Sequence, residues 1–528
     1  MSGAIRGTGV SDRLLEWPAA EHFPPLLWFR RLVQFRERRP MAFAPVFCVL
    51  CFVGFARAGL EALTTRVGAG TTPAFVNNTT FYLQAAYLYA ALTAKLSGRS
   101  LPTALSVVMV GMFLGICPPL VDVVLGNFGH GYYRYVEGGF SAWSFSLFNP
   151  AHYSTGEALV LWMSVLLPAA YVAETTRSLS RTLLALAGSY AVTTFIAVGP
   201  SSLVEWALRG ASPLTPARFG FAALTFVQLV VAQLAYLAFR PLLARRLLRR
   251  LVHALPFVAL TFLGNALANR FRPGDFSLLE RAHYAVGAAL VVLELCIVAL
   301  VQNDAFDLEE DVGRPAGEAT REDAYFFTGI GLVLVLAILH ASPPLGTPVA
   351  LFFIGTTLYS FDFCRAKRWF PVNYKLEGVW GSTSFVLGGS AVYLKYAEPP
   401  LSGAFLVATA IVFAGWFCFN VFKDYKDIRA DVHAGNQTLY ALAYEYGISL
   451  GRLHRALLVA FSASLLAPVA LLVLAGVAAA PALLVGAAAA LVAIRTLGGP
   501  PRGATVRAFL WLVTVYVVAL AALVELSG

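Results

Sequence analysis

Apolar stretches of close to twenty residues recur along the whole chain, separated by short polar connections. Each is long enough to cross the ~30 Å hydrocarbon core of a bilayer as an α-helix. Backbone groups in lipid must be hydrogen-bonded within the segment, so such stretches predict spanning helices. We therefore predict an all-α, polytopic membrane protein with about fifteen transmembrane helices.

A cluster of arginines near residues 240–250 separates two groups of predicted spans, about six before it and about nine after it. The predicted spans lie near 41–60, 80–96, 102–126, 156–174, 182–198, 219–239, 252–268, 283–302, 324–341, 346–362, 378–394, 402–419, 456–475, 479–494 and 507–526. We predict an N-terminal membrane module of residues 1–245, whose function the sequence leaves unknown, and a C-terminal module of residues 246–528.

Lys and Arg residues concentrate on alternate connections between the predicted spans. The positive-inside rule then places the N-terminus in the cytosol, together with the connections that follow residues 302 and 419. The connection at 270–282 is an exception, because it carries three arginines on the outer side. We expect a multi-pass integral protein of the plasma (inner) membrane.

The composition agrees with this assignment, since 58% of the residues are hydrophobic and only 13% are charged. The net charge of +10 does not indicate nucleic acid, because Lys and Arg cluster at the ends of apolar stretches, where they meet lipid head groups. We expect membrane lipids as partners and no nucleic acid. The six cysteines form no CxxC pair, and the first forty residues lack the apolar core of a cleavable signal peptide.

The first candidate site follows the predicted span that ends near residue 302. Asn303, Asp307 and Asp311 are spaced i, i+4, i+8, so they share one face if the helix continues. Like charges at this spacing repel one another unless cations hold them together. Mg²⁺ prefers hard oxygen ligands and commonly bridges carboxylates to a diphosphate.

A second acidic stretch follows the predicted span that ends near residue 419. Asp424, Asp427 and Asp431 are spaced i, i+3, i+7, again on one helical face. Both stretches fall on the predicted cytosolic side, so we predict one shared metal–diphosphate site that faces the cytosol. The N-terminal module contains no acidic pair and no His/Cys cluster.

These two stretches carry a family resemblance. Asn303-Asp304-x-x-Asp307-x-x-x-Asp311 with Arg314-Pro315 resembles the first aspartate motif of the UbiA superfamily of membrane prenyltransferases. Asp424-x-x-Asp427-x-x-x-Asp431, followed by Gly435 and Thr438-Leu439, resembles the second. The resemblance covers about residues 250–528 and implies a nine-helix UbiA-like bundle, whereas the N-terminal module is not recognised.

The resemblance implies a Mg²⁺-dependent enzyme that transfers a prenyl group from a prenyl diphosphate to a lipophilic or aromatic acceptor. The implied metal ligands are Asn303, Asp307, Asp311, Asp424, Asp427 and Asp431. The implied catalytic carboxylates are Asp307, Asp311, Asp427 and Asp431. The implied substrate-binding residues are Asn303, Arg314, Arg321, Tyr359, Arg365, Lys367 and Lys423. The family often has a second Arg-Pro soon after the first, whereas this chain has residues 316–321 there, ending in Arg321.

Two other functions stay open from the sequence. A transporter or channel would place its acidic residues at mid-membrane depth in discontinuous helices. Here the acids lie at span ends beside basic residues, which favours diphosphate binding. A UbiA-type terpene cyclase would use the same motifs on the prenyl chain alone. The sequence leaves open the prenyl length, the acceptor, the oligomeric state and the role of the N-terminal module.

Overall fold

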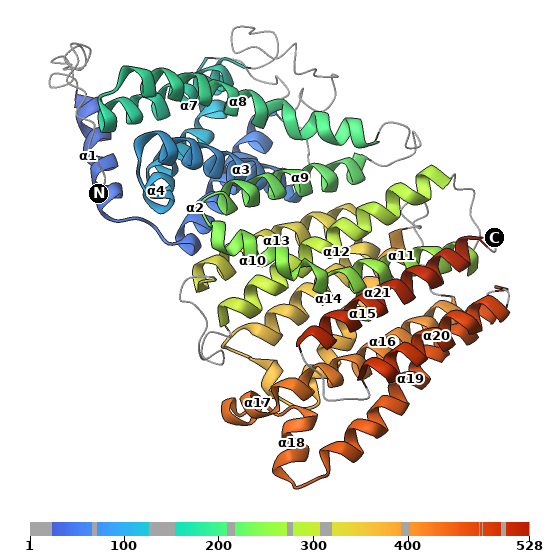
Figure 1. The fold of residues 1–528 in the computed structure, drawn as a ribbon. Helices are drawn as coiled ribbons and strands as arrows, with labels where there is room; N and C mark the ends of the chain where they lie inside the picture. Colours follow the sequence, from blue (N-terminus) through green and yellow to red (C-terminus); the bar gives the residue numbers. More distant parts are fainter. Residues whose placement is uncertain are drawn as a thin grey trace. The chain divides into compact units, whose positions relative to one another are not determined.

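The computed structural model describes residues 24–65, 71–125, 154–208, 217–271, 278–306, 319–391, 402–474, 476–477, 479–497 and 503–526. Within these ranges the elements are α-helices and short 3₁₀ helices, with no strand (Figure 1). The prediction of an all-α protein is confirmed.

Each of the predicted spans falls mainly on one described helix, except the span near 102–126, which falls on two α-helices and the 3₁₀ helix between them. In the described part of the chain, 9 helices are long and apolar enough to cross a membrane individually, and up to 10 if one bent pair counts as a single span. They are Phe43–Leu63, Leu101–Val124, Thr155–Thr176, Leu179–Ala207, Gly220–Leu237, Glu280–Phe306, Arg321–Ala341, Gly403–Phe422 and Leu450–Val469, and the bent pair is Pro241–His253 with Leu255–Phe271. The chain is therefore a polytopic membrane protein.

The contacts divide the chain into two compact units, which we describe separately. Unit 1 comprises Met1–Arg209 and Ala223–Pro241, and unit 2 comprises Gly210–Ala222 and Leu242–Gly528. The boundary expected between residues 245 and 246 lies inside helix α10 (Pro241–Arg250), and it stays a prediction.

Unit 1 contains helices that pack mainly against their neighbours in the chain. They are α1 (Pro24–Arg38), α2 (Phe43–Thr65), α3 (Thr71–Ser97), α4 (Leu101–Met112), η3 (Phe113–Ile116), α5 (Cys117–Val124), α7 (Thr155–Thr176), α8 (Leu179–Leu208) and most of α9 (Ala217–Leu237). Helix α3 packs against α2, α4 and α8, and α7 packs against α8. The third predicted span is interrupted by the 3₁₀ helix η3, and Pro118 and Pro119 follow directly at the start of α5.

Unit 2 begins with the amphipathic helix α10, followed by η5 (Leu251–His253). Its long helices are α11 (Leu255–Phe271), α12 (Leu278–Phe306), α13 (Arg321–Ala341), α14 (Pro343–Ser360), α15 (Val372–Ala391), α16 (Gly403–Lys423), α19 (Leu450–Leu474), α20 (Ala479–Leu497) and α21 (Gly503–Leu526). Each of these helices contacts the next along the chain, and α21 contacts α11. The helices therefore pack in chain order into a closed bundle.

Helices α11 and α15 pack against each other through small residues. A Cβ atom on Gly264 would lie 1.9 Å from the carbonyl oxygen of Phe385, and one on Gly388 would lie 1.8 Å from that of Thr261. Glycine at both positions therefore permits direct backbone contact, as is common between membrane helices. Asn265 donates a hydrogen bond to the carbonyl of Gly388 at 3.2 Å, which adds a polar link to this contact.

Candidate active site

The first acidic stretch begins on the last turn of α12. Asn303 is half-buried there, and the described part of this helix ends at Phe306. Asp307, Asp311 and Arg314 lie outside the described residues, so their predicted roles stay predictions. The structure nevertheless shows which residues surround Phe306, the residue directly before Asp307.

Asp304, the neighbour of Asn303, is a buried carboxylate with 1% of its surface exposed. It forms ion pairs with Arg246, at 2.5 Å between Nε and Oδ2, and with Arg250. Both arginines come from α10, where their i, i+4 spacing puts them on one face. We interpreted this basic cluster from the sequence as a contact with lipid head groups, and that interpretation missed its pairing with the first acidic motif.

Two of the predicted substrate-binding arginines meet at Asp362, just beyond the C-terminus of α14. Arg321 donates to Asp362 at 2.9 Å, and Arg365 approaches the same carboxylate at 3.9 Å. Arg365 also donates to the carbonyl oxygen of Phe306 at 3.4 Å, and the Arg321 guanidinium lies 5.9 Å from the centre of the Phe306 ring. The end of α12 is therefore flanked by two guanidinium groups. The sequence analysis missed Asp362.

The residues between α14 and α15, which we call the 361–371 loop, hold two of the predicted basic residues in buried positions. Arg365 is 8% exposed and Lys367, in the 3₁₀ helix η6 (Ala366–Arg368), is 7% exposed. Arg365 adopts a left-handed backbone conformation with φ of 44°, which is uncommon for a residue other than glycine. The chain reverses here so that Arg365 contacts the end of α12.

The second acidic stretch changes its helical geometry as it leaves α16. Asp424 begins the 3₁₀ helix η8 (Asp424–Asp427), and α17 (Ile428–Ala434) continues from it. In a 3₁₀ helix residues i and i+3 eclipse, so positions 424 and 427 share one side. The side chains of Lys423 and Asp427 are outside the described part, and their roles stay predictions.

Asp424 is held by a tyrosine that the sequence analysis did not identify. Tyr374, near the start of α15, donates its hydroxyl proton to Asp424 Oδ2 at 2.7 Å and accepts a hydrogen bond from the Leu439 amide at 3.0 Å. Burial and the neighbouring carboxylate raise the pKa of the Tyr374 phenol. The phenol therefore stays protonated at neutral pH and acts as a hydrogen-bond donor to Asp424.

Asp431 orders the connection between α17 and α18 (Leu439–Glu445). Its two carboxylate oxygens accept hydrogen bonds from Asn436 at 3.2 Å and from Thr438 at 3.1 Å. Thr438 is also the N-cap residue of α18. This contact gives Asp431 a structural role, while its predicted role as a metal ligand and catalytic group stays a prediction.

The 361–371 loop contacts the end of α12, within the first acidic stretch, and the connection that follows the second acidic stretch. On one side Arg365 donates to the carbonyl of Phe306 at the end of α12. On the other side the Arg368 carbonyl accepts a hydrogen bond at 3.0 Å from the amide of Gln437, in the connection that Asp431 orders. The loop therefore places the ends of the two stretches on the same side of the unit 2 bundle. Whether their carboxylates oppose one another across one cavity stays a prediction.

Tyr359 is the remaining predicted substrate-binding residue with a described side chain. It lies on the last turn of α14 and contacts α15. Its hydroxyl donates to Glu377 at 3.0 Å, and its ring centre is 5.0 Å from that of Trp380. Glu377 is 4% exposed and was missed by the sequence analysis. This contact fixes the direction of the Tyr359 phenol.

An apolar cavity of about 80 Å³ lies within unit 2, between α11, α15, α16, α19 and α21. Three aromatic residues, Trp416, Phe419 and Phe461, contribute to its walls. Helix α16 supplies much of the lining and ends directly before Asp424. The cavity and the second acidic stretch are thus carried by the same helix.

The predicted metal ligands form an all-oxygen set, which suits Mg²⁺. Only Asn303, Asp424 and Asp431 of this set have described side chains. Within the described residues, no group of three or more His, Cys, Asp or Glu side chains is arranged to hold a metal ion. The side chains of Asp307, Asp311 and Asp427 lie outside the described residues, so the predicted Mg²⁺ site stays a prediction.

Comparison with known proteins gives a family match for the C-terminal half of the chain. No curated protein and no solved structure matches the chain. The profile of the UbiA prenyltransferase family matches residues 257–515, which include α11 to α20, most of α21 and both acidic stretches. The N-terminal part has no family match. The C-terminal half of this chain therefore belongs to the UbiA prenyltransferase family.

Proposed function

We propose that unit 2 catalyses the Mg²⁺-dependent transfer of a prenyl group from a prenyl diphosphate to an aromatic or lipid acceptor in the membrane. The observation that carries the proposal is the 361–371 loop, which brings Arg365 to the end of α12 and also contacts the connection that follows the second acidic stretch. Family membership supports prenyl transfer, and the loop supports a shared site for the two stretches.

The charges near this loop suit a diphosphate. Arg321 and Asp362 are both exposed, with 59% and 44% of their side-chain surfaces accessible. An exposed ion pair contributes at most about 1 kcal/mol, so Arg321 could exchange Asp362 for a phosphate oxygen at little cost. Arg365 and Lys367 are already buried and held in place, so they would add cationic groups without further ordering.

Mg²⁺, when bound by the oxygen ligands of the two stretches, would neutralise the negative charge that develops on the departing diphosphate. The described residues position those ligands. Asp304, neutralised by Arg246 and Arg250, fixes the last turn of α12 and with it Asn303. Tyr374 fixes Asp424 through its hydroxyl.

The apolar cavity of unit 2 suits the prenyl chain. Its walls exclude water, and its aromatic side chains favour a carbon that becomes cation-like as the allylic C–O bond breaks. An acceptor would attack that carbon, forming the new bond as the diphosphate leaves with the electron pair of the broken bond, and the proton that the acceptor loses would pass to the departing diphosphate. The predicted orientation of the site toward the cytosol would let the diphosphate group enter from the cytosol.

Purified full-length protein should be incubated with labelled prenyl diphosphates and a membrane lipid extract, and the products identified by mass. We expect a prenylated acceptor to form with Mg²⁺ and not with EDTA. Asp307→Ala and Asp427→Ala should each lower turnover at least about 100-fold, the scale for removing one group that stabilises transition-state charge.

Glu445→Ala is the matched control, because Glu445 is an exposed carboxylate at the end of α18. It should retain wild-type turnover. Full activity of both aspartate variants in EDTA would contradict the proposal. A cyclised prenyl product that forms without any acceptor would identify a terpene cyclase instead.

A further inference from the structure

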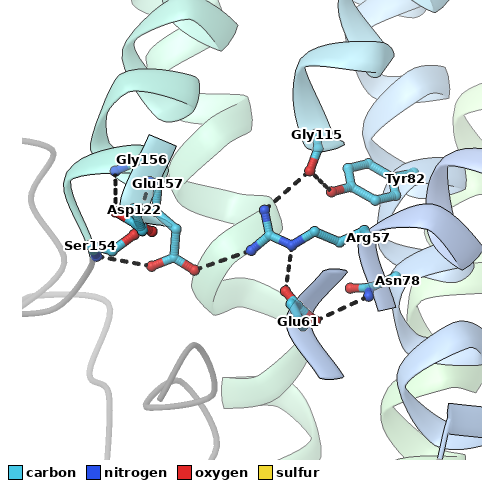
Figure 2. A network of polar contacts seen from close by, with 9 residues as sticks. All are labelled: Arg57, Glu61, Asn78, Tyr82, Gly115, Asp122, Ser154, Gly156 and Glu157. Atoms are coloured by element: carbon cyan, nitrogen blue, oxygen red, sulfur yellow. Dashed lines mark hydrogen bonds and ion pairs between the residues drawn. The ribbon is translucent and has the colours of Figure 1, made fainter. Parts of the chain in front are cut away.

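Unit 1 contains a buried charged network inside its membrane-spanning helices (Figure 2). Arg57 on α2 is 7% exposed and forms ion pairs with Glu61, one turn later, and with Glu157 on α7 at 3.5 Å. Its guanidinium also donates to the carbonyl of Gly115 at 3.1 Å. Ionisable side chains within spanning helices are costly, and they commonly mark functional sites.

Helix capping explains only part of this network. Asp122 accepts a hydrogen bond from the Gly156 amide at 2.9 Å, and Glu157 accepts one from the Ser154 amide at 3.1 Å, so both carboxylates cap the start of α7. Glu61 has no such task. It pairs with Arg57 and accepts a hydrogen bond from Asn78 at 3.4 Å.

The 3₁₀ stretch of the third span lies against the same network. Gly115 belongs to η3, and its carbonyl accepts hydrogen bonds from both Arg57 and Tyr82, the latter at 2.9 Å (Figure 2). A Cβ atom on Gly115 would lie 2.5 Å from the Tyr82 ring, so this close approach depends on glycine. A stretch of 3₁₀ helix within a longer helix often marks a functional hinge or a sequence under strain.

A cavity of about 200 Å³ adjoins the network. Arg57, Glu61, Asn78 and Glu157 all line it, while much of the remaining wall is apolar. A cavity needs a volume of only about 10–15 Å³ to hold one water molecule, so the volume of this cavity is more than ten times larger than one water requires.

A second cavity adjoins the first along α7. Its volume is about 60 Å³, and it shares four lining residues with the first, namely Tyr89, Gly111, Met112 and Ser164. Along α7 the lining runs from Glu157 past Ser164 to Tyr171. At 1.5 Å per helical residue this path is about 20 Å long. Two adjoining cavities, charged at one end and lined mostly by apolar residues along α7, suit an amphiphile.

We infer that this pair of cavities in unit 1 binds a neutral lipid with a hydroxyl head group, which lies at Arg57, Glu61 and Asn78 while its chain follows α7. A hydroxyl can donate to the Glu61 carboxylate and accept from the guanidinium or the Asn78 amide. A carboxylate head would compete with Glu61 and Glu157 for Arg57, and an ammonium head would lie beside a guanidinium. The inference stands apart from the function proposed for unit 2.

The test uses full-length protein in detergent and a hexadecanol probe with a photoreactive diazirine in its chain and a terminal alkyne. We expect crosslinks in peptides of α3, α7 and α8, and competition by unlabelled hexadecanol. Hexadecanoate and hexadecylamine should compete at least about tenfold less well, because charge-assisted hydrogen bonds discriminate on this scale. Equal competition by either charged amphiphile would overturn the hydroxyl assignment.

Two variants and their controls test the position of the ligand. Glu61→Gln should weaken labelling about tenfold by removing the charged acceptor. Ala197→Phe should abolish labelling by filling the cavity, since Ala197 lines its apolar wall. The matched controls are Glu205→Gln and Leu203→Phe, both exposed positions on α8 that do not line the cavity, and they should label like wild type.

Unchanged labelling of Ala197→Phe would overturn the inference, as would crosslinks confined to unit 2. Ala197→Phe leaves the charged network intact, so it decides the question even where Glu61→Gln does not fold.

Discussion

The described carboxylates near the candidate active site are each held by specific partners. Tyr374 donates to Asp424, Asn436 and Thr438 donate to Asp431, and arginines neutralise Asp304. Hydrogen bonds from neutral donors fix the direction of a carboxylate without cancelling its charge. Asp424 is therefore held in one orientation by a neutral donor, whereas Asp304 is paired with two arginines on α10.

At the residue scale we expect Tyr374→Phe to raise the Mg²⁺ concentration that gives half-maximal activity by about 10-fold or more. Partners that orient a metal ligand typically contribute a factor of 10–100 in metal affinity or activity. A Mg²⁺ titration of prenyl transfer measures this shift, and excess Mg²⁺ should restore most of the turnover.

Tyr440→Phe is the control for this prediction. Tyr440 is also buried, but its hydroxyl pairs with His454 at 2.9 Å rather than with an aspartate. Its Mg²⁺ dependence should match that of the wild type. Equal shifts in the two variants would mean that a loss of packing, and not the orientation of Asp424, causes the effect.

Sequence reasoning identified residues through local spacing and missed those whose partners are distant. Asn303 and Asp424 belong to short periodic motifs, so they could be proposed without a structure. Arg57 and Glu157 are separated by 100 positions along the chain, and no local pattern connects them. The N-terminal module has no pair of acidic residues that are neighbours in sequence. Glu61 and Glu157 are distant in sequence, but both pair with Arg57.

At the scale of helices and loops, hydropathy located every predicted span on described helices but did not anticipate where helices change form. The second acidic stretch was expected to form one continuous stripe, whereas it passes from the 3₁₀ helix η8 into α17. The third span is likewise interrupted at η3. Apolar composition determines membrane insertion, while such local changes depend on tertiary contacts, such as those that Gly115 makes with Arg57 and Tyr82.

The contact between α11 and α15 gives a prediction about stability. Gly388→Ala would push a methyl group into the backbone of Thr261, so the helices must move apart. We expect a loss of about 1–3 kcal/mol, the usual range for overpacking. Thermal unfolding of the purified protein, followed by tryptophan fluorescence, measures the decrease.

Gly403→Ala is the matched control, because a Cβ atom on Gly403 meets no atom within 4 Å. Its position at the start of α16 accepts alanine, which restricts the unfolded chain, so stability should stay unchanged or rise by up to about 1 kcal/mol. An unfolding temperature for Gly388→Ala equal to that of the control would contradict the close packing of α11 and α15.

At the scale of the whole molecule, the sequence predicted a nine-helix bundle but not how it closes. The contact between α21 and α11 completes the bundle, and the residues that make it are far apart in the chain. Helix α10 adds a connection that span counting could not supply, because its arginines pair with Asp304 on α12.

This arrangement predicts how the chain can be divided. Residues 242–528 should insert alone and bind prenyl diphosphate like the full-length protein, whereas residues 1–241 should bind none. Residues 255–528, which lack both arginine partners of Asp304, should lose stability by about 3 kcal/mol or more, the scale for leaving a buried charge unpaired. Equilibrium binding of a labelled prenyl diphosphate, with unfolding temperatures in the same detergent, compares the three fragments.

A folded fragment 242–528 that binds no prenyl diphosphate would show that both units build the site. A fragment 255–528 as stable as fragment 242–528 would show that α10 contributes nothing to unit 2.

The 361–371 loop has a consequence for where this protein could tolerate a break in its backbone. The helices on either side of the loop pack against each other and against α12, so a single protease cut within it would leave the bundle assembled. The same cut would let Arg365 and Arg368 move independently, although the first contacts the end of α12 and the second contacts the connection after the second acidic stretch. Nicked protein should therefore melt near the temperature of intact protein while losing its affinity for diphosphate, so that folding and substrate capture become separable properties of one chain.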